Sequence, residues 1–152
     1  MSTKFRVLRQ LKIEFGDCDP AGIVFNPRYF AFFDAGTMAL MEAALGAGKK
    51  DILERFGFKG WAVGETGAKF FIPCSYSEII GVESTLVEFG RSTFVVQHRV
   101  LKDGGAVAVE GRETRVWIGL HPDDPKRMKA LPIPDAVREA FAGDFAEPIR
   151  VA

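Results

Sequence analysis

The pattern of apolar and polar residues predicts five β-strands in this chain. The first covers residues 5–15, with an apolar face that is broken by Arg9 and mostly polar side chains on the other face. The other four predicted strands cover residues 61–74, 80–86, 94–100 and 107–120. In the second strand, Phe70, Phe71 and Ile72 form a run apolar enough to be buried on both faces, and Pro73 indicates where that strand ends.

A helical pattern follows the first predicted strand. Residues 27–45 carry apolar side chains nearly all the way round the helix, which is typical of a buried central helix. Gly46 is a residue type that commonly ends helices, and a short amphipathic helix is predicted over residues 49–55. From Pro122 the chain becomes rich in prolines and charges before a helical patch at residues 135–141, so we expect a C-terminal extension over residues 122–152.

The order of these elements is a strand, a long helix and then four antiparallel strands. This order is typical of an α+β fold in which a helix covers one face of an antiparallel sheet. With 152 residues, the chain is long enough to bury a hydrophobic core and is predicted to form one domain, residues 1–152.

The charge balance gives no indication of a nucleic-acid or membrane partner. Lys and Arg total 20, as do Asp and Glu, so the formal net charge is zero. The N-terminal residues lack the apolar core of a signal peptide and no apolar run reaches membrane-spanning length, so we expect a cytoplasmic protein. Cys18 and Cys74 are then predicted to be free thiols. The two histidines, His98 and His121, are too far apart in sequence to suggest a metal site.

The segment from residue 15 to residue 29 joins the first strand to the long helix and carries the most informative chemistry. Residues 19–22 (Asp-Pro-Ala-Gly) are typical of a tight turn, and Asn26 followed by Pro27 is typical of a helix start. A helix start offers free backbone N–H groups and the positive end of the helix dipole. An acid beside such donors can catalyse acyl transfer, because the acid attacks or activates water while the amides hold a developing oxyanion. The alternative is that Asp19 only shapes the turn and Asn26 only caps the helix.

Three further side chains are candidates for a role near this segment. Cys18 adjoins Asp19, but a thiol nucleophile requires a base and neither histidine is close in sequence, so a Cys–His enzyme is not favoured. Asp34 interrupts the apolar surface of the helix, where it is either a paired or solvent-facing acid or part of a wet pocket. Glu65 interrupts an apolar strand and is either a second acid of the site or an exposed strand carboxylate.

The run Gly16-Asp-Cys-Asp-Pro-Ala-Gly-Ile-Val24, followed by Asn26-Pro-Arg-Tyr29 and Asp34, resembles the active-site segment of the 4-hydroxybenzoyl-CoA thioesterase family. Members of this family are acyl-CoA thioesterases with the hotdog fold, an antiparallel sheet wrapped around a long central helix. The resemblance is dense in this segment and scattered over most of the chain as far as Leu120.

The resemblance implies specific roles for the residues of the segment. Asp19 matches the catalytic acid, the backbone N–H of Asn26 matches the group that polarises the thioester carbonyl, and Asp34 matches an acid that contacts an aryl hydroxyl. Tyr29 and Phe33 line the same helix with aromatic side chains, which suit a flat acyl group.

Recognition of CoA requires a basic residue near its phosphates. Arg91 lies in the turn before the fourth strand, where the family has basic residues, and Ser92 follows it. A solvated surface arginine is the alternative. The resemblance also implies a homo-oligomer, a dimer or a dimer of dimers, formed by edge-to-edge sheet pairing with sites at subunit interfaces.

We therefore expect hydrolysis of an aromatic, hydroxybenzoyl-like acyl-CoA to the free acid and CoA, with neither a metal nor an organic cofactor. Three alternatives stay open. The first is an aliphatic or broad-range acyl-CoA thioesterase. The second is dehydration of an acyl chain, which relies on a histidine that this loop lacks. The third is a non-catalytic acyl-CoA-binding hotdog module.

Overall fold

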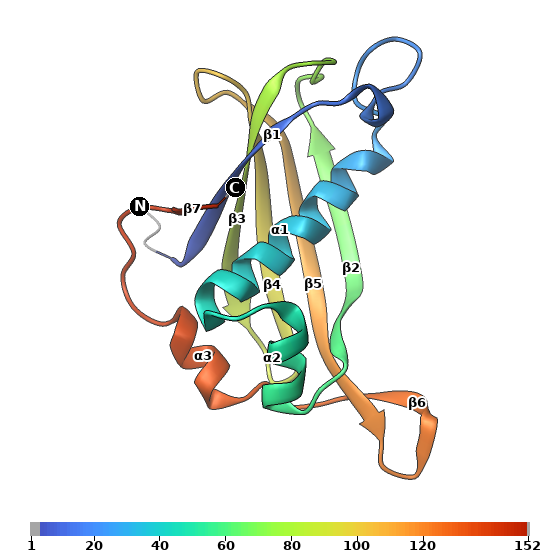
Figure 1. The fold of residues 1–152 in the computed structure, drawn as a ribbon, viewed down its shortest axis with the longest axis vertical. Coiled ribbons are helices and arrows are strands. Elements are labelled where there is room, and N and C mark those ends of the chain that lie inside the picture. The colour runs from blue at the N-terminus through green and yellow to red at the C-terminus, as the bar shows by residue number, and fades with distance from the viewer. Residues whose placement is uncertain (1–3, 152) are drawn as a thin grey trace.

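One mixed β-sheet and one long helix form the framework of the protein (Figure 1). The computed structural model describes residues 4–151. The strands are β1 (Arg6–Lys12), β2 (Gly60–Phe70), β3 (Ile79–Phe89), β4 (Thr93–Leu101), β5 (Val107–His121), β6 (Asp124–Ala130) and β7 (Ile149–Val151). The helices are the short 3-10 helix η1 (Phe15–Asp17), α1 (Pro27–Leu45), α2 (Lys49–Phe56) and α3 (Asp135–Phe141).

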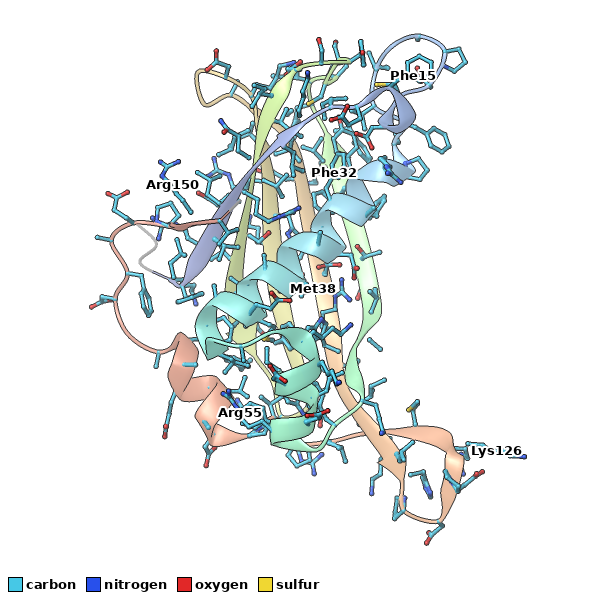
Figure 2. The ribbon with its side chains drawn as sticks, in the orientation of Figure 1. Phe15, Phe32, Met38, Arg55, Lys126 and Arg150 are labelled. Atoms are coloured by element: carbon cyan, nitrogen blue, oxygen red, sulfur yellow. The ribbon has the colours of Figure 1, made fainter. Side chains whose placement is uncertain are left out.

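The strand order across the sheet is β2-β5-β4-β3-β1-β7, and β6 pairs with the last residues of β5. All pairs are antiparallel except β1 with β7. In Figure 1, α1 crosses one face of the sheet, from the end that holds the β1–α1 loop toward the end that holds α2 and α3. Figure 2 marks these two ends by Phe15 at the first and Arg55 at the second. This is the arrangement expected of a hotdog fold.

Helix α1 begins and ends where the sequence predicts. Pro27 is its first residue, and its C-cap is Gly46 in the left-handed conformation at φ 66°. Its buried residues form one stripe, which consists of Tyr29, Phe33, Gly36, Thr37, Leu40 and Met41. The opposite side, which includes Asp34, is exposed, so the prediction of a helix buried on every side is wrong for a single chain.

No single helix within residues 4–151 is long and apolar enough to cross a membrane, and only α1 and α2 taken together, with a bend of 62° between them, have the length and composition of a span.

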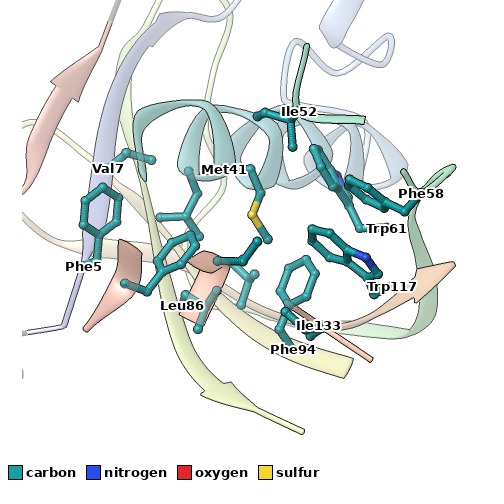
Figure 3. Close-up of a cluster of buried hydrophobic side chains, with 14 residues drawn as sticks. Phe5, Val7, Met41, Ile52, Phe58, Trp61, Leu86, Phe94, Trp117 and Ile133 are labelled. Carbon is teal, nitrogen blue, oxygen red and sulfur yellow. The ribbon is translucent and has the colours of Figure 1, made fainter. Parts of the chain in front are cut away.

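The interior contains two separate hydrophobic clusters. One lies against the second half of α1, and Figure 3 shows Phe58, Trp61 and Trp117 gathered at one side of it. Phe58 and Trp117 are in direct ring contact. Their rings stack with centroids 3.7 Å apart. This cluster includes Val137 and Phe141 of α3, so the C-terminal segment packs on the same core. The other cluster lies against the first half of α1.

Polar side chains separate the two clusters. On the inner face of each central strand the residue between the clusters is polar, namely Ser84 on β3, His98 on β4 and Glu113 on β5. Ser84 and His98 lie directly opposite each other in the β3–β4 pairing. Thr37 of α1 and Arg115 of β5 are buried beside them. We call these five residues the polar belt.

Two glycines allow α1 to lie directly on the belt. A Cβ atom at Gly36 would overlap the hydroxyl of Ser84, and one at Gly111 would overlap the ring of Phe33. That ring stacks on His98 with centroids 4.7 Å apart. Larger side chains at either glycine would therefore push the helix away from the sheet.

The structure confirms the predicted helices and the positions of the central strands, corrects two other predictions and adds two strands that were not predicted. Phe15 belongs to η1 and is 82% exposed, whereas it was predicted on the buried face of the first strand. Strand β2 ends at Phe70, and the run of residues 70–72 is exposed rather than buried on both faces. The C-terminal segment contains two strands, β6 and β7, which are mostly exposed and therefore lack an apolar alternation.

Candidate active site

The loop between β1 and α1 folds back on itself and pairs with a second loop. The N–H of Asp19 donates to the carbonyl of Ile23 at 2.9 Å, and the N–H of Gly22 donates to the carbonyl of Asp19 at 2.9 Å. Gly22 has a φ of +81°, a conformation that favours glycine. Ile23 also forms an isolated bridge with Ser75, in the loop after β2. These contacts confirm the predicted tight turn at residues 19–22.

The two acids of this loop have different surroundings. Asp17 is buried, with Oδ1 accepting from Nε of Arg28 at 2.7 Å and Oδ2 accepting from the N–H of Glu14 at 2.9 Å. Asp19 is partly exposed, and its Oδ1 accepts from the N–H of Ala21 at 2.8 Å. Its other oxygen, Oδ2, has no hydrogen-bond or ion-pair partner in residues 4–151. Asp19 therefore shapes the turn and still keeps a free carboxylate oxygen.

The first turn of α1 presents a free backbone donor. Asn26 precedes the helix with helical backbone angles, φ −47° and ψ −45°, and its side chain makes no capping hydrogen bond. The capping role suggested by its residue type is therefore wrong for the side chain. Its backbone N–H makes no hydrogen bond among the described residues, and Pro27 has no N–H. The Asn26 N–H is thus available at the positive end of the helix dipole.

An apolar cavity of about 230 Å³ lies beside this donor. Its walls include Ile23, Asn26, Tyr29, Phe70, Phe71 and Ile72. The ring centroids of Tyr29 and Phe70 lie 5.8 Å apart. The exposed apolar run at the end of β2 therefore forms the wall of a cavity at the start of α1, and its flat rings suit an aromatic or other apolar group.

The thiol of Cys18 is not placed to act as a nucleophile. Desolvation, followed by the charges of Asp17 and Asp19, raises the pKa of Cys18 and disfavours the thiolate. His98 is fully buried in the polar belt, and His121 is the last residue of β5, so neither serves as a base for this thiol. Over the described part of the chain, no three His, Cys, Asp or Glu side chains are grouped so that they would hold a metal ion.

Two residues predicted to bind substrate lie away from the cavity. Phe33 is fully buried and stacks on His98, so it belongs to the core. Glu65 is exposed on β2 and pairs with Thr114, on the sheet face away from α1. There it lines a different hollow of about 430 Å³. That hollow is larger than the cavity at Asn26 but includes no residue of α1.

Asp34 lies on the exposed side of α1 and pairs with a buried arginine. Its Oδ1 accepts from Nη2 of Arg115 at 2.8 Å, while 59% of the side chain remains exposed. The same Nη2 donates to Oε2 of Glu113 at 2.7 Å. In Figure 2, the part of α1 that carries Asp34 lies between the labelled residues Phe32 and Met38. The pair thus connects the helix surface to the polar belt.

The sequence analysis did not identify the polar belt as a unit. Nε2 of His98 donates to Oε1 of Glu113 at 2.7 Å, and the hydroxyl of Thr37 donates to the same oxygen at 2.6 Å. The hydroxyl of Ser84 donates to Nδ1 of His98 at 2.8 Å. Each member therefore has a partner, as buried polar groups require.

Burial and hydrogen bonding set the charges within the belt. Burial lowers the pKa of His98, so the imidazole is neutral at neutral pH. Burial alone would raise the pKa of Glu113, but the hydrogen bonds from His98 and Thr37 and the positive charge of Arg115 outweigh burial and lower that pKa to about 2. The belt therefore holds an ionised glutamate between a neutral histidine and an arginine cation.

Arg91 and Ser92 belong to the turn between β3 and β4, and this turn is at the opposite end of the sheet from the β1–α1 loop (Figure 1). They follow β3, whose 11 residues span about 36 Å. Nη1 of Arg91 donates to Oγ of Ser92 at 3.4 Å, and Arg138 of α3 donates to the carbonyls of Gly90 and Arg91 at 2.6 and 3.1 Å. Arg91 and Asp19 can therefore share a site only when a second copy of the chain brings them together.

The chain is similar to known thioesterases over most of its length. It is 31% identical over 131 residues to a 4-hydroxybenzoyl-CoA thioesterase of Pseudomonas sp. (strain CBS-3), covering 84% of this chain and 92% of that protein. The solved structure of 4-hydroxybenzoyl CoA thioesterase from Pseudomonas sp. strain CBS-3 matches with a TM-score of 0.80 and 28% identity, covering 90% of this chain and 99% of that one. A gentisyl-coenzyme A thioesterase structure matches with a TM-score of 0.75 and 27% identity, covering 89% and 99%.

These similarities confirm the hotdog fold that the sequence resemblance implied. A family model described as the thioesterase-like superfamily matches residues 13–141, a span that contains the loop with Asp19, all of α1 and strands β2 to β6. This protein is a member of the thioesterase-like superfamily.

Proposed function

We propose that this protein hydrolyses the thioester of an aromatic, hydroxybenzoyl-like acyl-CoA to the free acid and CoA. One observation carries the proposal. The free carboxylate oxygen of Asp19 and the free N–H of Asn26 belong to the same folded segment, and Asn26 borders an aromatic-lined cavity. Membership of the thioesterase-like superfamily supports the same reaction.

Asp19 and Asn26 divide the proposed chemistry between them. The thioester carbonyl oxygen accepts a hydrogen bond from the Asn26 N–H, and the dipole of α1 stabilises the negative charge that develops on that oxygen. The carboxylate of Asp19 either attacks the carbonyl carbon, giving an anhydride that water then hydrolyses, or takes a proton from the attacking water. In both routes the C–S bond breaks, the thiolate of CoA leaves and is protonated, and one water molecule is consumed. The scheme requires neither a metal nor an organic cofactor.

The residues along α1 support an aromatic acyl group with a hydroxyl. Tyr29, Phe70 and Phe71 provide flat apolar walls beside Asn26. Asp34 lies eight residues further along the helix, about 12 Å away along its axis, which suits the length of a hydroxybenzoyl group with a hydrogen bond at each end. Both thioesterases compared above are named for hydroxylated aromatic acyl groups. In this proposal Asp34 accepts the hydrogen bond of the aryl hydroxyl.

A second copy of the chain completes the proposed site. The cavity at Asn26, about 230 Å³, is smaller than ligand pockets of about 300–1,000 Å³. β2 is an edge strand with mostly exposed side chains. Antiparallel pairing of two β2 strands would bring the Arg91 end of one copy toward the Asp19 end of the other, with Glu65 at the interface.

We therefore propose a homodimer or a dimer of dimers in which Arg91 and Ser92 of one copy bind the CoA held by the other. A cytoplasmic location is part of the proposal and agrees with two free cysteines. Sedimentation equilibrium gives the mass of the assembly, and a monomer at assay concentrations would contradict the shared site.

Release of thiol from a small panel of acyl-CoAs tests the proposed function. The wild-type protein is assayed with 4-hydroxybenzoyl-, benzoyl- and hexanoyl-CoA, and free CoA is followed with a thiol reagent. We expect the largest kcat/KM for 4-hydroxybenzoyl-CoA, because Asp34 accepts a hydrogen bond that acyl groups without the hydroxyl cannot donate. Hexanoyl-CoA as the best substrate would indicate an aliphatic or broad-range thioesterase. No release from any of the three would indicate a non-catalytic binding protein.

A further inference from the structure

The carboxylate of Asp34 is held on one side and open on the other. Nη2 of Arg115 donates to Oδ1 at 2.8 Å, and the side chain is 59% exposed. Oδ2 has no partner among residues 4–151. A carboxylate held in this way can accept a hydrogen bond from a ligand through its free oxygen. The direction of that oxygen depends on where Arg115 is held.

Arg115 is held in place by the other members of the polar belt. Its Nη2 donates to Oε2 of Glu113 at 2.7 Å. The other oxygen of Glu113 accepts from Thr37 at 2.6 Å and from His98 at 2.7 Å. None of these four side chains is more than 4% exposed. Because close packing leaves buried side chains few alternative rotamers, the guanidinium reaches Asp34 from one defined position.

The charge balance shows that Asp34 is not required to neutralise Arg115. Glu113 already supplies one negative charge at 2.7 Å from the guanidinium. Asp34 adds a second negative charge, so these three side chains together carry one excess negative charge. Asp34 is the exposed member of the three. This arrangement favours a cation or a strong hydrogen-bond donor as the ligand. The hydroxyl of a phenol is such a donor.

Stability alone does not account for this group of buried charges. Nε of Arg115 is buried without a hydrogen-bond partner among the described residues, and an unpaired buried donor costs about 1–3 kcal/mol. Buried ion pairs can often be replaced by apolar residues without loss of stability. The belt also lies between two hydrophobic clusters. A role in positioning explains why charges are retained here at this cost.

We infer that Arg115, held by Glu113, is a positioning residue that aims the free oxygen of Asp34 at the hydroxyl of the acyl substrate. The inference rests on the proposed function, because it requires Asp34 to meet the hydroxyl of an acyl group bound at Asn26. Arg115 does not contact the substrate in this scheme, since it lies behind Asp34 and is 4% exposed. It acts on the selectivity for the hydroxyl group and not on the bond that breaks.

A double-mutant cycle on substrate selectivity tests the inference. The measured quantity is the ratio of kcat/KM for 4-hydroxybenzoyl-CoA to kcat/KM for benzoyl-CoA, in wild type, Asp34→Ala, Arg115→Gln and the double variant. We expect each single substitution to lower this ratio by roughly tenfold, the scale of one lost hydrogen bond to a charged group. We expect Arg115→Gln to have no further effect on the ratio in the Asp34→Ala background, because Arg115 acts through Asp34.

A purely structural role for Arg115 gives a different result. Both substrates would then be hydrolysed more slowly by the same factor in Arg115→Gln, and the ratio would stay at its wild-type value, which overturns the inference. Arg112→Gln is the matched control, because Arg112 lies on the same strand but is exposed and only 4.0 Å from Glu88 in a surface ion pair. Its ratio is expected to equal that of wild type.

The test remains decisive if Arg115→Gln does not fold. Arg115→Lys keeps a buried positive charge beside Glu113 but lacks the planar guanidinium that reaches two carboxylates. We expect a lowered ratio for this variant too. A folded Arg115→Lys protein with the wild-type ratio overturns the inference.

A measurement without substrate separates this inference from the proposed function. If wild type does not favour 4-hydroxybenzoyl-CoA over benzoyl-CoA, the proposed substrate class is wrong. The χ1 rotamer of Asp34, measured from NMR scalar couplings, then tests positioning alone. We expect one rotamer in wild type and in Arg112→Gln, and averaging between rotamers in Arg115→Gln. A single unchanged rotamer in Arg115→Gln overturns the inference, whichever acyl-CoA the enzyme prefers.

Discussion

Two acids lie next to α1, one in the loop before the helix and one on a strand beneath its middle. Their carboxylates differ in exposure and in the number of hydrogen bonds that they accept. At the start of the helix, Asp19 is partly exposed and accepts one hydrogen bond, at 2.8 Å. Beneath the middle of the helix, Glu113 of β5 is 3% exposed. It accepts hydrogen bonds from Thr37, His98 and Arg115 at 2.6 to 2.7 Å. The first region is built from one loop, whereas the second joins a helix to two strands.

The number of donors around each carboxylate decides what it can do. Three donors favour the ionised form of Glu113, lower its pKa to about 2 and leave it tightly bound. Asp19 keeps one oxygen without a partner in residues 4–151, and it lies in the same loop that ends at the free N–H of Asn26. The capacity to react therefore belongs to the carboxylate that keeps an oxygen without a donor, and the capacity to orient belongs to the carboxylate whose two oxygens are both held by donors.

The largest expected effect comes from removing the charge of Asp19. Asp19→Asn keeps a side-chain oxygen that can accept from the N–H of Ala21, so the turn is retained while the reactive carboxylate is lost. We expect kcat with 4-hydroxybenzoyl-CoA to fall by about 10²- to 10⁴-fold, with little change in the thermal unfolding midpoint. Steady-state thiol release and circular dichroism melting measure the two quantities. Near-normal turnover would show that another acid is catalytic.

Asp17→Asn is the matched control, because it makes the same chemical change two residues away. It weakens the ion pair between the buried Asp17 and the half-exposed Arg28, in which the two atoms are 2.7 Å apart, and should lower the free energy of unfolding by about 1–3 kcal/mol. The loss of kcat in the folded variant should be far smaller than in Asp19→Asn. Equal losses of kcat in the two variants would contradict the distinction between a structural and a reactive acid.

A smaller effect is expected from acid titration of the polar belt. The pKa of Glu113 is about 2 in the folded protein and ordinarily 4.5. Between these values the unfolded chain binds the proton and the folded protein does not, so stability rises with pH. The contribution of Glu113, about 3 kcal/mol, is therefore fully present above pH 4.5 and is lost as the pH falls toward 2.

Urea unfolding of wild type and Glu113→Gln across this range measures the contribution. We expect the variant to be less stable at pH 7 and the difference in unfolding free energy to shrink as the pH falls from 4.5 to 2. Glu88→Gln, at a side chain that is 67% exposed, is the control and should change stability by less than about 0.5 kcal/mol. A difference between wild type and Glu113→Gln that does not vary with pH would rule out an ionised Glu113 held by the belt.

Local elements of the fold were predictable because their causes lie within a few residues of each other. Helix α1 (Pro27–Leu45) begins at a proline and ends at Gly46, and helix α3 (Asp135–Phe141) also matches its predicted bounds. The turn at residues 19–22 follows from the conformations that its residue types adopt. The resemblance of this segment to thioesterases then indicated the fold and the chemistry, because the residues that carry the resemblance lie in one short stretch of the chain.

The polar belt had a signal in the sequence that alternation could have revealed. Glu113 and Arg115 occupy alternate positions on β5 between Gly111 and Trp117, and all four lie on the buried face. Periodicity of this kind shows that a polar side chain points inward. It does not show which group receives it, since Arg115 pairs with Asp34 from 81 residues away.

Spacing and residue type specified the helices, the central strands, the tight turn and the segment that resembles an active site. Tertiary packing alone decided that the apolar run at residues 70–72 lines a cavity, that Phe33 belongs to the core, and that Arg91 lies at the far end of the sheet. The physical reason is that local preferences act over one or two turns of chain, whereas burial and hydrogen bonding depend on which distant residues pack together. A sequence pattern identifies an apolar face, and only the folded chain determines what covers it.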